Sequence, residues 1–280
     1  MHFVDRALAR RFESAEEMPQ VHHAYAAQKL QPEIGAAVAP IAGGHMIFAG
    51  LGSPIGRAVG MGFSGSVTEG DFDELEGFYY SRKAPSQLDY CPLTHMSLLE
   101  IARKRGYQIA ELNNVLARKL DPNENFTTEA AGFHLRASQP GEAQAFSAIL
   151  RESFFPEGGE PAGFDEMLAP MFSFPGAITF VAECDGNLVA TGAGLIIPDH
   201  RIVALFGAGT LKPHRSRGVQ TAMLGRRLAL AAQSGCEYAV IVTQGGTTSQ
   251  RNAERIGFRV AYSKATLIKD YRPDLPPDQK

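Results

Sequence analysis

Cysteine is scarce in this 280-residue sequence, which holds only Cys91, Cys184 and Cys236 and no CxxC pair. An odd and widely spaced set does not make a disulfide framework, so we expect reduced thiols, as in a cytosolic protein. A catalytic thiol is the alternative, but buried apolar cysteine is the commoner case. The sequence therefore predicts a fold that does not rest on disulfide bonds.

Long apolar runs are also lacking, because no stretch reaches the length that spans a bilayer. Residues 1–14 carry charges throughout and have no apolar centre, so no secretion signal is expected there. We therefore expect a cytoplasmic protein that has no membrane partner.

No block of lysine and arginine stands out, and the formal net charge is -3. Because binding to nucleic-acid phosphates depends on clustered cations, we do not expect nucleic acid as a partner. Hydrophobic residues make up 44% and charged residues 20%, which is the composition of a globular protein with a full core. The length of 280 residues suits two domains of ordinary size.

Apolar periodicity in the first half predicts alternating helices and strands. Phe72, Leu75, Phe78 and Tyr79 share one side of a helix whose first turn is acidic. Gly106 suits the left-handed C-cap of the helix that follows. We expect helices at 16–30, 71–83 and 95–105, and strands at 45–49, 87–91 and 107–120.

The segment 121–131 is polar, contains proline and lacks apolar periodicity, so it is the best linker candidate. It separates two expected domains, 1–122 and 131–280. In the second, the turn Asp185-Gly186-Asn187 between two apolar runs is a strong hairpin signal. We expect strands at 133–137, 177–184, 188–197, 201–211, 238–243 and 258–269, and helices at 140–152, 163–171, 218–234 and 248–256.

Both halves end with the same order of elements: helix, short strand, helix, a glycine followed by an aromatic residue, and a long strand. The matching segments are 102–107 and 253–258. The shared order is either a coincidence between two α/β segments of common organisation or the result of a tandem duplication. We favour a duplication in which one copy kept its chemistry.

The stretch from Thr210 to Leu224 carries the strongest functional signal. A buried strand ends there, and a loop with Arg215, Arg217 and Gly218 leads into an Ala/Leu-rich helix. The first N–H groups of a helix are unpaired and bind phosphate, glycine admits close approach, and arginine adds charge-assisted bonds. A solvated surface loop is the plainer alternative, and a Rossmann loop fits poorly because no GxGxxG is present.

This loop resembles the pyrophosphate loop of the GNAT acetyltransferase superfamily, (Arg/Gln)-x-x-Gly-x-(Gly/Ala), and reads Arg-Ser-Arg-Gly-Val-Gln at 215–220. Gln220 replaces the small residue, so its side chain needs room beside the phosphates. The order of elements over 133–269 is also similar to the family's. The resemblance implies a mixed α/β fold of two GNAT-like domains, each a mostly antiparallel sheet flanked by helices, with the first domain degenerate.

The resemblance implies an N-acetyltransferase that takes acetyl-CoA as co-substrate, needs no metal, and acetylates an amine of a small molecule or peptide. A homodimer is a possible assembly. In this family pantetheine inserts where the strand before the loop splays from the next strand, and the Leu211 N–H would polarise the thioester carbonyl. The implied coenzyme-binding residues are Thr210, Leu211, Arg215, Ser216, Arg217, Gly218, Val219, Gln220, Ser249 and Asn252.

The catalytic acid and base are left open by the sequence. In many family members a tyrosine protonates the departing thiolate, but the matching position is Ala253. Ser249 and Asn252 could substitute for it, and ordinary capping residues are an equally good interpretation. An alkylammonium is neutral only about one part in 10^3 at neutral pH, so a base or a water chain is required.

Candidate bases near the expected cleft are Glu183, Asp199, His200 and Glu237. The strand interior at 201–209 contains no acid, so a water-mediated route is as good an interpretation. Holding the amine and the thioester in line supplies much of the rate in either case.

The first half has no counterpart of the arginine-rich loop. Its segment 63–70 contains glycines but no arginine, and Glu69 and Asp71 would repel phosphate. We therefore expect this half not to bind CoA, and its aromatic residues either line an acceptor pocket or belong to the core. Two rival interpretations remain: a non-catalytic acyl-CoA-binding regulatory module, and an unrelated α/β protein with a fortuitous arginine-rich loop.

Overall fold

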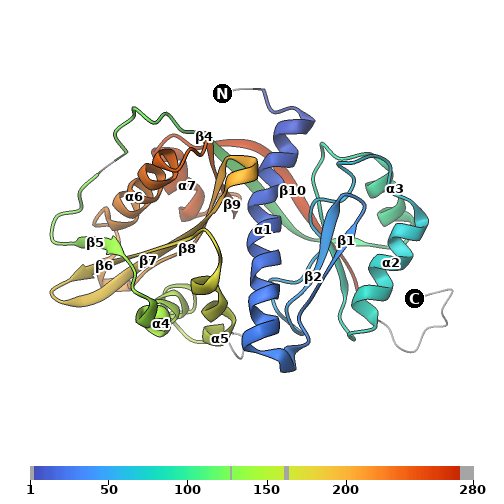
Figure 1. The fold of residues 1–280 in the computed structure, drawn as a ribbon, viewed down its shortest axis with the longest axis horizontal. Coiled ribbons are helices and arrows are strands. Elements are labelled where there is room, and N and C mark those ends of the chain that lie inside the picture. The colour runs from blue at the N-terminus through green and yellow to red at the C-terminus, as the bar shows by residue number, and fades with distance from the viewer. Residues whose placement is uncertain (1–2, 127, 161–163, 272–280) are drawn as a thin grey trace. The chain divides into compact units, whose positions relative to one another are not determined.

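The computed structural model describes residues 3–126, 128–160 and 164–271. The chain divides into two compact units, of which unit 1 comprises 1–115 and 260–280 and unit 2 comprises 116–259. The fold is mixed α/β with helices flanking a mixed sheet, as the sequence predicts (Figure 1). Among the described residues, no helix has both the length and the apolar character needed to cross a membrane.

Unit 1 begins with the long helix α1 (Arg6–Leu30), which is capped by the Asp5 carboxylate accepting the Leu8 N–H. The expected start at residue 16 is wrong, since 16 − 6 = 10 residues precede it in the helix. Ala9 and Phe12 are buried and extend the apolar stripe toward the cap. The charged residues next to them in the sequence made this apolar periodicity hard to recognise.

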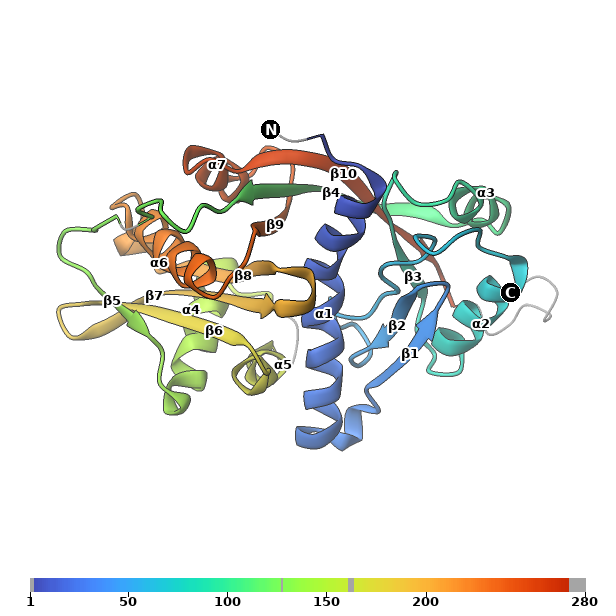
Figure 2. The ribbon, with the colours of Figure 1, turned by 45° about the horizontal axis from the view of Figure 1, so that its top comes forward.

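A hairpin, two helices and further strands complete unit 1 (Figure 2). The strand β1 was not expected, because Pro40 and the surrounding glycines mask its pattern. Of the four residues predicted to share one helix side, Phe72, Leu75 and Tyr79 are fully buried, and Phe78 is half-buried. The Tyr79 hydroxyl donates to the Ile47 carbonyl at 3.0 Å. The elements are β1 (Ala37–Ile41), β2 (Gly44–Phe48), α2 (Glu69–Tyr80), β3 (Ser86–Tyr90), α3 (Ser97–Lys104) and β4 (Gln108–Lys119).

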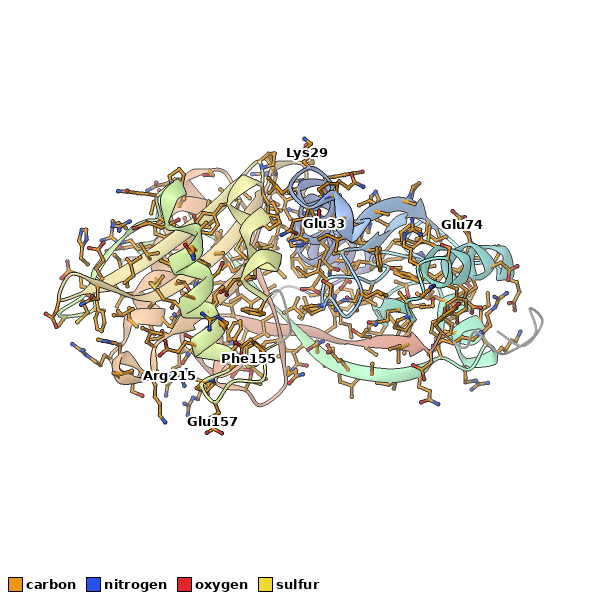
Figure 3. All side chains as sticks on the ribbon, turned by 90° about the horizontal axis from the view of Figure 1, so that it is seen from below. Lys29, Glu33, Glu74, Phe155, Glu157 and Arg215 are labelled. Carbon is orange, nitrogen blue, oxygen red and sulfur yellow. The ribbon has the colours of Figure 1, made fainter. Side chains whose placement is uncertain are left out.

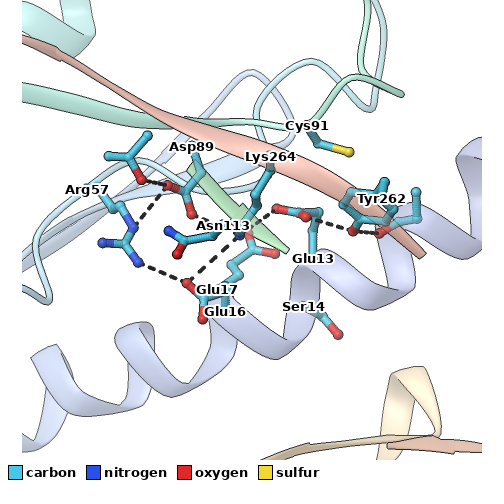
Figure 4. A network of polar contacts seen from close by, with 12 residues as sticks. Glu13, Ser14, Glu16, Glu17, Arg57, Asp89, Cys91, Asn113, Tyr262 and Lys264 are labelled. Carbon is cyan, nitrogen blue, oxygen red and sulfur yellow. Dashed lines mark hydrogen bonds and ion pairs between the residues drawn. The ribbon is translucent and has the colours of Figure 1, made fainter. Parts of the chain in front are cut away.

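A buried ion network lies in unit 1 between α1, β3 and the last strand, β10 (Arg259–Lys269) (Figure 4). Lys264 Nζ lies 3.2 Å from a Glu13 carboxylate oxygen and 2.9 Å from one of Asp89. Burial opposes the charge of Lys264, but Asp89 and Glu13 outweigh it and raise its pKa. Nothing in the sequence pattern indicated this network.

The network continues on both sides of Lys264. Arg57 lies 3.1 Å from Asp89 and 2.9 Å from Glu16. The Tyr262 hydroxyl donates to Glu13 at 2.7 Å. Burial raises the pKa of Glu13, and it also acts to raise the pKa of Asp89, which Lys264 and Arg57 nevertheless lower.

The three cysteines are free and buried, so the prediction of reduced thiols is confirmed. Burial raises the pKa of Cys91 to about 12 and that of Cys236 to about 11. Neither thiol is therefore activated as a nucleophile.

Unit 2 holds a sheet in the order β9-β8-β7-β6-β5 with α4 on one face and α6 on the other (Figure 1). The pair β8–β9 is parallel, and the other pairs are antiparallel. The sequence predicted these elements nearly to the residue, although Gly163 lies outside the described residues. The elements are β5 (His134–Ala137), α4 (Ala143–Phe154), α5 (Phe164–Leu168), β6 (Ala177–Cys184), β7 (Asn187–Ile197), β8 (Ile202–Thr210), α6 (Val219–Gln233), β9 (Tyr238–Gln244) and α7 (Thr248–Arg255).

The segment expected as a linker packs on unit 2 where the structure describes it; Thr127 lies outside the described residues. Phe126 is buried, and the Arg118 guanidinium lies 4.8 Å from the centre of its ring. A Cβ at Gly225 of α6 would come within 2.1 Å of the Phe126 carbonyl oxygen. Glycine at this helix position therefore lets the segment lie directly on α6.

Candidate functional site

The neighbouring strands β8 and β9 diverge along their length. They pair only where Ile202–Ala204 faces Tyr238–Val240. Beyond that point β8 stays paired with β7 as far as Thr210, whereas its other edge has no strand partner among the described residues. The splay that the resemblance implies is therefore present, and it leaves an open β-strand edge.

The register shows which backbone groups of β8 face this open edge. Leu211 N–H donates to the Val189 carbonyl at 3.0 Å, so it points toward β7. Backbone groups alternate in an antiparallel ladder, so those of Thr210 point the opposite way. This corrects the role expected for the Leu211 N–H: it is already engaged, and the Thr210 N–H is the donor that faces the gap.

A β-bulge interrupts the ladder between β7 and β8. Thr191 pairs with Gly209 and Ala193 pairs with Phe206, so two residues of β8 face one residue of β7. Gly207 adopts a left-handed conformation there, with φ of 56°. Bulges of this kind re-aim backbone groups and are frequent beside active sites.

The loop after β8 ends at an open helix N-terminus. Ser216 and Gly218 are both left-handed, with φ of 61° and 80°. Gly218 is the N-cap of α6, and no side chain caps this end of the helix. The N–H groups of its first turn therefore have no partner inside the helix and none from a capping side chain. Because no acid lies in this turn, the site suits an anion.

The two arginines of the loop have different surroundings. Arg215, labelled in Figure 3, is exposed. It donates to the Thr210 carbonyl at 2.9 Å and to the Ser153 carbonyl, near the end of α4, at 3.0 Å. These bonds brace the loop and use two of its five N–H groups. The Arg217 guanidinium lies 4.5 Å from the centre of the Phe133 ring and is exposed.

Gln220, which departs from the family pattern, turns its side chain into the sheet. Its Nε2 lies 2.7 Å from the Gly209 carbonyl oxygen, 3.2 Å from that of Thr191 and 2.8 Å from Thr210 Oγ1. The longer side chain therefore does not occupy the space in front of the helix N-terminus. The backbone of the first turn stays accessible.

Helix α7 carries Ser249, Asn252 and Ala253 and begins after Thr247. Thr247 Oγ1 accepts the Gln250 N–H at 3.3 Å, but the Gln250 side chain accepts from Gly246 rather than Thr247. The N-terminus of α7 therefore has only one half of a capping box. Ser249 is exposed and Asn252 half-buried, and among the described residues no hydrogen bond joins either to 215–220.

Ala253 occupies the position where many family members have tyrosine, and it is 1% exposed. A hydroxyl from this position is therefore missing, and the methyl group packs in the interior.

The expected bases are not brought together with the loop. Glu183 lies on β6, with β7 between it and β8, and Arg136 lies 2.5 Å away and lowers its pKa. Asp199 and His200 lie in the hairpin before β8, and Glu237 pairs nearby with Arg201 at 2.7 Å. This end of β8 is roughly 25 Å from the loop at about 3.3 Å per residue.

The diverging parts of the two strands contain no titratable side chain. They read Leu-Phe-Gly-Ala-Gly-Thr over 205–210 and Ile-Val-Thr-Gln over 241–244. A water-mediated proton path, the open alternative from the sequence, fits this arrangement better than any of the four expected bases.

The sequence from 143 to 258 matches the model of the acetyltransferase (GNAT) family. This match supports the resemblance to the GNAT family. It runs from α4 to Phe258 and includes the loop and both diverging strands. The GNAT family in general performs acetyl-CoA-dependent acyl transfer. No curated protein matches the chain.

Solved structures share the fold of the chain. A GCN5-related N-acetyltransferase from Kribbella flavida has a TM-score of 0.62 and 17% identity, covering 89% of this chain and 95% of its own. A tandem GNAT protein from the clavulanic acid biosynthesis pathway gives 0.59 and 11%, covering 82% and 79%. A functionally unknown conserved protein from Staphylococcus epidermidis gives 0.58 and 11%, covering 87% and 97%. At these identities the likeness shows the fold alone.

One buried residue of α6 escaped the sequence analysis. Arg227 is 2% exposed and donates to the carbonyl oxygens of Ala193 at 2.8 Å and Met223 at 3.3 Å. The sequence position of Arg227 could have indicated its burial, because Arg227 continues the apolar helix face that contains Met223 and Ala231. A charge on that face marks a special contact.

Proposed function

We propose that unit 2 is an N-acetyltransferase that transfers the acetyl group of acetyl-CoA to an amine. The observation that carries this proposal is the meeting of an open β8 edge with the uncapped N-terminus of α6. The unpaired N–H groups of such a helix end can bind a pyrophosphate. The unpaired backbone groups of an open strand edge can bind an extended pantetheine arm. Few other ligands combine two negative phosphates with an extended amide-bearing chain.

The residues present fit the coenzyme. The N–H groups of Val219 and Gln220 belong to the open first turn, and Gly218 supplies the left-handed N-cap. Ser216 and Arg217 are exposed beside this turn and can add donors to the phosphates. We also propose that Ser249 and Asn252 of α7 contact the coenzyme.

The backbone near the bulge can stabilise the developing charge. The Thr210 N–H points to the open edge next to the loop, where the pantetheine arm can accept it, and a backbone N–H of β8 at the bulge can donate to the carbonyl oxygen of a thioester at the end of the extended arm. The amine attacks the carbonyl carbon, the C–S bond breaks, and the thiolate leaves. The proton lost by the ammonium passes to water, since the diverging strands offer no base.

Unit 1 is proposed to lack a coenzyme site. The N-terminus of α2 is occupied by its own acid, because Asp71 Oδ2 accepts both the Thr68 N–H and the Thr68 hydroxyl at 2.7 Å. Glu69 adds a second negative charge to this turn. A phosphate would meet repulsion here, in contrast to the acid-free first turn of α6.

Calorimetry with CoA tests the binding step. Arg217→Glu places a negative charge beside the phosphates, and we expect the affinity for CoA to fall at least tenfold. Arg226→Glu is the matched control, because Arg226 is an exposed arginine two turns further along α6 and should leave the affinity nearly unchanged. Equal loss in both variants, or no binding by the unaltered protein, contradicts the proposal.

A non-catalytic acyl-CoA-binding module is the second candidate function. Ala253 in the tyrosine position and the absence of a titratable side chain at 205–210 and 241–244 favour it. Acetyl-CoA consumption over a panel of amines, measured beside binding, separates the two. Binding with turnover supports the enzyme, and binding without turnover supports the module.

A further inference from the structure

Helix α6 sends two polar side chains into the sheet, Gln220 and Arg227. They are 227 − 220 = 7 residues apart, which is about two turns, so they lie on the same helix face. The rest of this face is apolar and includes the buried residues Met223 and Leu224. Two polar residues on a buried face need partners inside the protein.

Arg227 is an unusual buried cation. It is 2% exposed, and among the described residues no carboxylate pairs with it. Burial lowers its pKa to about 10, so the guanidinium is still charged at neutral pH. Taking a charge out of water without an ion partner is strongly unfavourable, so the contacts it makes must compensate.

Those contacts surround the bulge of the β7–β8 ladder. Arg227 Nη1 lies 2.8 Å from the carbonyl oxygen of Ala193 and 3.5 Å from that of Phe206. These two residues form the register pair on one side of the bulge.

Gln220 makes the corresponding contacts on the other side. Its Nε2 lies 2.7 Å from the Gly209 carbonyl oxygen and 3.2 Å from that of Thr191. These two residues form the next register pair. One helix therefore donates hydrogen bonds to carbonyl groups of both pairs that flank the irregular turn of β8.

The sheet is shaped to admit the guanidinium. Gly192 is the β7 residue opposite the bulge, and a Cβ there would come within 2.8 Å of Arg227 Cζ. Any side chain at this position would displace the guanidinium from the carbonyl groups. Glycine at 192 and arginine at 227 thus form a matched pair.

We propose that Gln220 and Arg227 form a clamp that fixes the β7–β8 bulge in the shape that binds the acyl carbonyl of the coenzyme. The inference rests on the proposed function and names positioning residues for it. By holding the carbonyl groups that flank the bulge, the clamp leaves backbone N–H groups of β8 directed to the open edge. Neither side chain needs to touch the reacting atoms.

The test compares two ligands that differ in one oxygen. S-ethyl-CoA has the carbon and sulfur atoms of acetyl-CoA but lacks the carbonyl oxygen, so the ratio of their dissociation constants reports the carbonyl contact. We expect the unaltered protein to bind acetyl-CoA about fivefold more tightly, the value of one neutral hydrogen bond. In Arg227→Met the ratio should fall to about one, whereas the affinity for S-ethyl-CoA changes little.

Arg226→Met is the matched control, because Arg226 is the neighbouring, exposed arginine of the same helix. It should keep the fivefold ratio. General loosening of the fold lowers both affinities together and leaves the ratio unchanged, so the ratio separates positioning from stability. Arg227→Lys, which keeps the charge and part of the donor set, should recover part of the ratio.

Gln220→Ala keeps the inference testable if Arg227→Met does not fold. Gln220 is only half-buried, and alanine restores the small residue of the family pattern. Its ratio should also fall toward one. A fivefold ratio in Gln220→Ala or in folded Arg227→Met overturns the clamp, as does a ratio of one in the unaltered protein. Failure of the unaltered protein to bind either ligand instead overturns the proposed function.

Discussion

Replacing Lys264 by methionine removes the central cation of the buried network in unit 1. Its side chain is 2% exposed, and those of its partners Glu13 and Asp89 are each 1% exposed. Asp89 keeps the guanidinium of Arg57 at 3.1 Å, whereas the hydrogen bond that Glu13 keeps among the described residues is the one from the Tyr262 hydroxyl. One buried carboxylate therefore loses its cation.

The expected loss follows from breaking a buried ion pair, which costs about 3–5 kcal/mol. Because Asp89 stays paired, we expect the lower end, about 3 kcal/mol, which lowers Tm by about 6–12 °C. Lys104→Met, at an exposed lysine of α3, is the control and should lower Tm very little. Thermal unfolding followed by circular dichroism measures both.

The stability lost in Lys264→Met should depend on pH. Burial already raises the pKa of Glu13 above its ordinary value, and loss of Lys264 raises it further. An acid whose folded pKa is raised binds its proton more tightly in the folded protein, so stability falls as pH rises through that pKa. The deficit of Lys264→Met should therefore be smaller at pH 5 than at pH 8.

A second substitution completes this test. Glu13→Gln removes the orphaned charge, and its amide oxygen can still accept from Tyr262, so the double variant with Lys264→Met should recover most of the lost stability. A deficit that is the same at pH 5 and pH 8, together with no recovery in the double variant, would refute the reasoning.

Three further substitutions have defined outcomes. Gly225→Ala should lower Tm by several degrees, because its Cβ would lie 2.1 Å from the Phe126 carbonyl oxygen. Gly218→Ala should weaken CoA binding in calorimetry and lower Tm by a few degrees, because alanine is strained at the φ of 80° of this N-cap even though open space surrounds it. Glu183→Gln should leave acetyl transfer unchanged in a CoA-release assay, because β7 separates Glu183 from β8; a tenfold loss would restore it as a candidate base.

The elements of unit 2 could be predicted from the sequence because each has a local signal. The Asp185-Gly186 turn set the β6–β7 hairpin, and the apolar periodicity set α6. The loop proposed to bind the coenzyme is likewise a continuous stretch, at 215–220, so its position and the helix that follows it could be predicted from local sequence. The splay of β8 came from the resemblance, because strand pairing is not local.

The rest depends on contacts between distant residues. Lys264 meets Glu13 across 251 positions of sequence, so no spacing rule points to the network. The sequence indicated that the Gln220 side chain needs room beside the phosphates, whereas three acceptors in the sheet turn it away from them. Candidate bases such as His200 were chosen by residue type, and the structure places His200 at the end of β8 opposite the loop.

A crystal structure determined with CoA tests the central claim most directly. The account predicts the diphosphate against the N–H groups of Val219 and Gln220, with the pantetheine arm extended beside β8 between Leu205 and Thr210. An empty gap between β8 and β9 at saturating CoA, or CoA bound at another place on the chain, would contradict it.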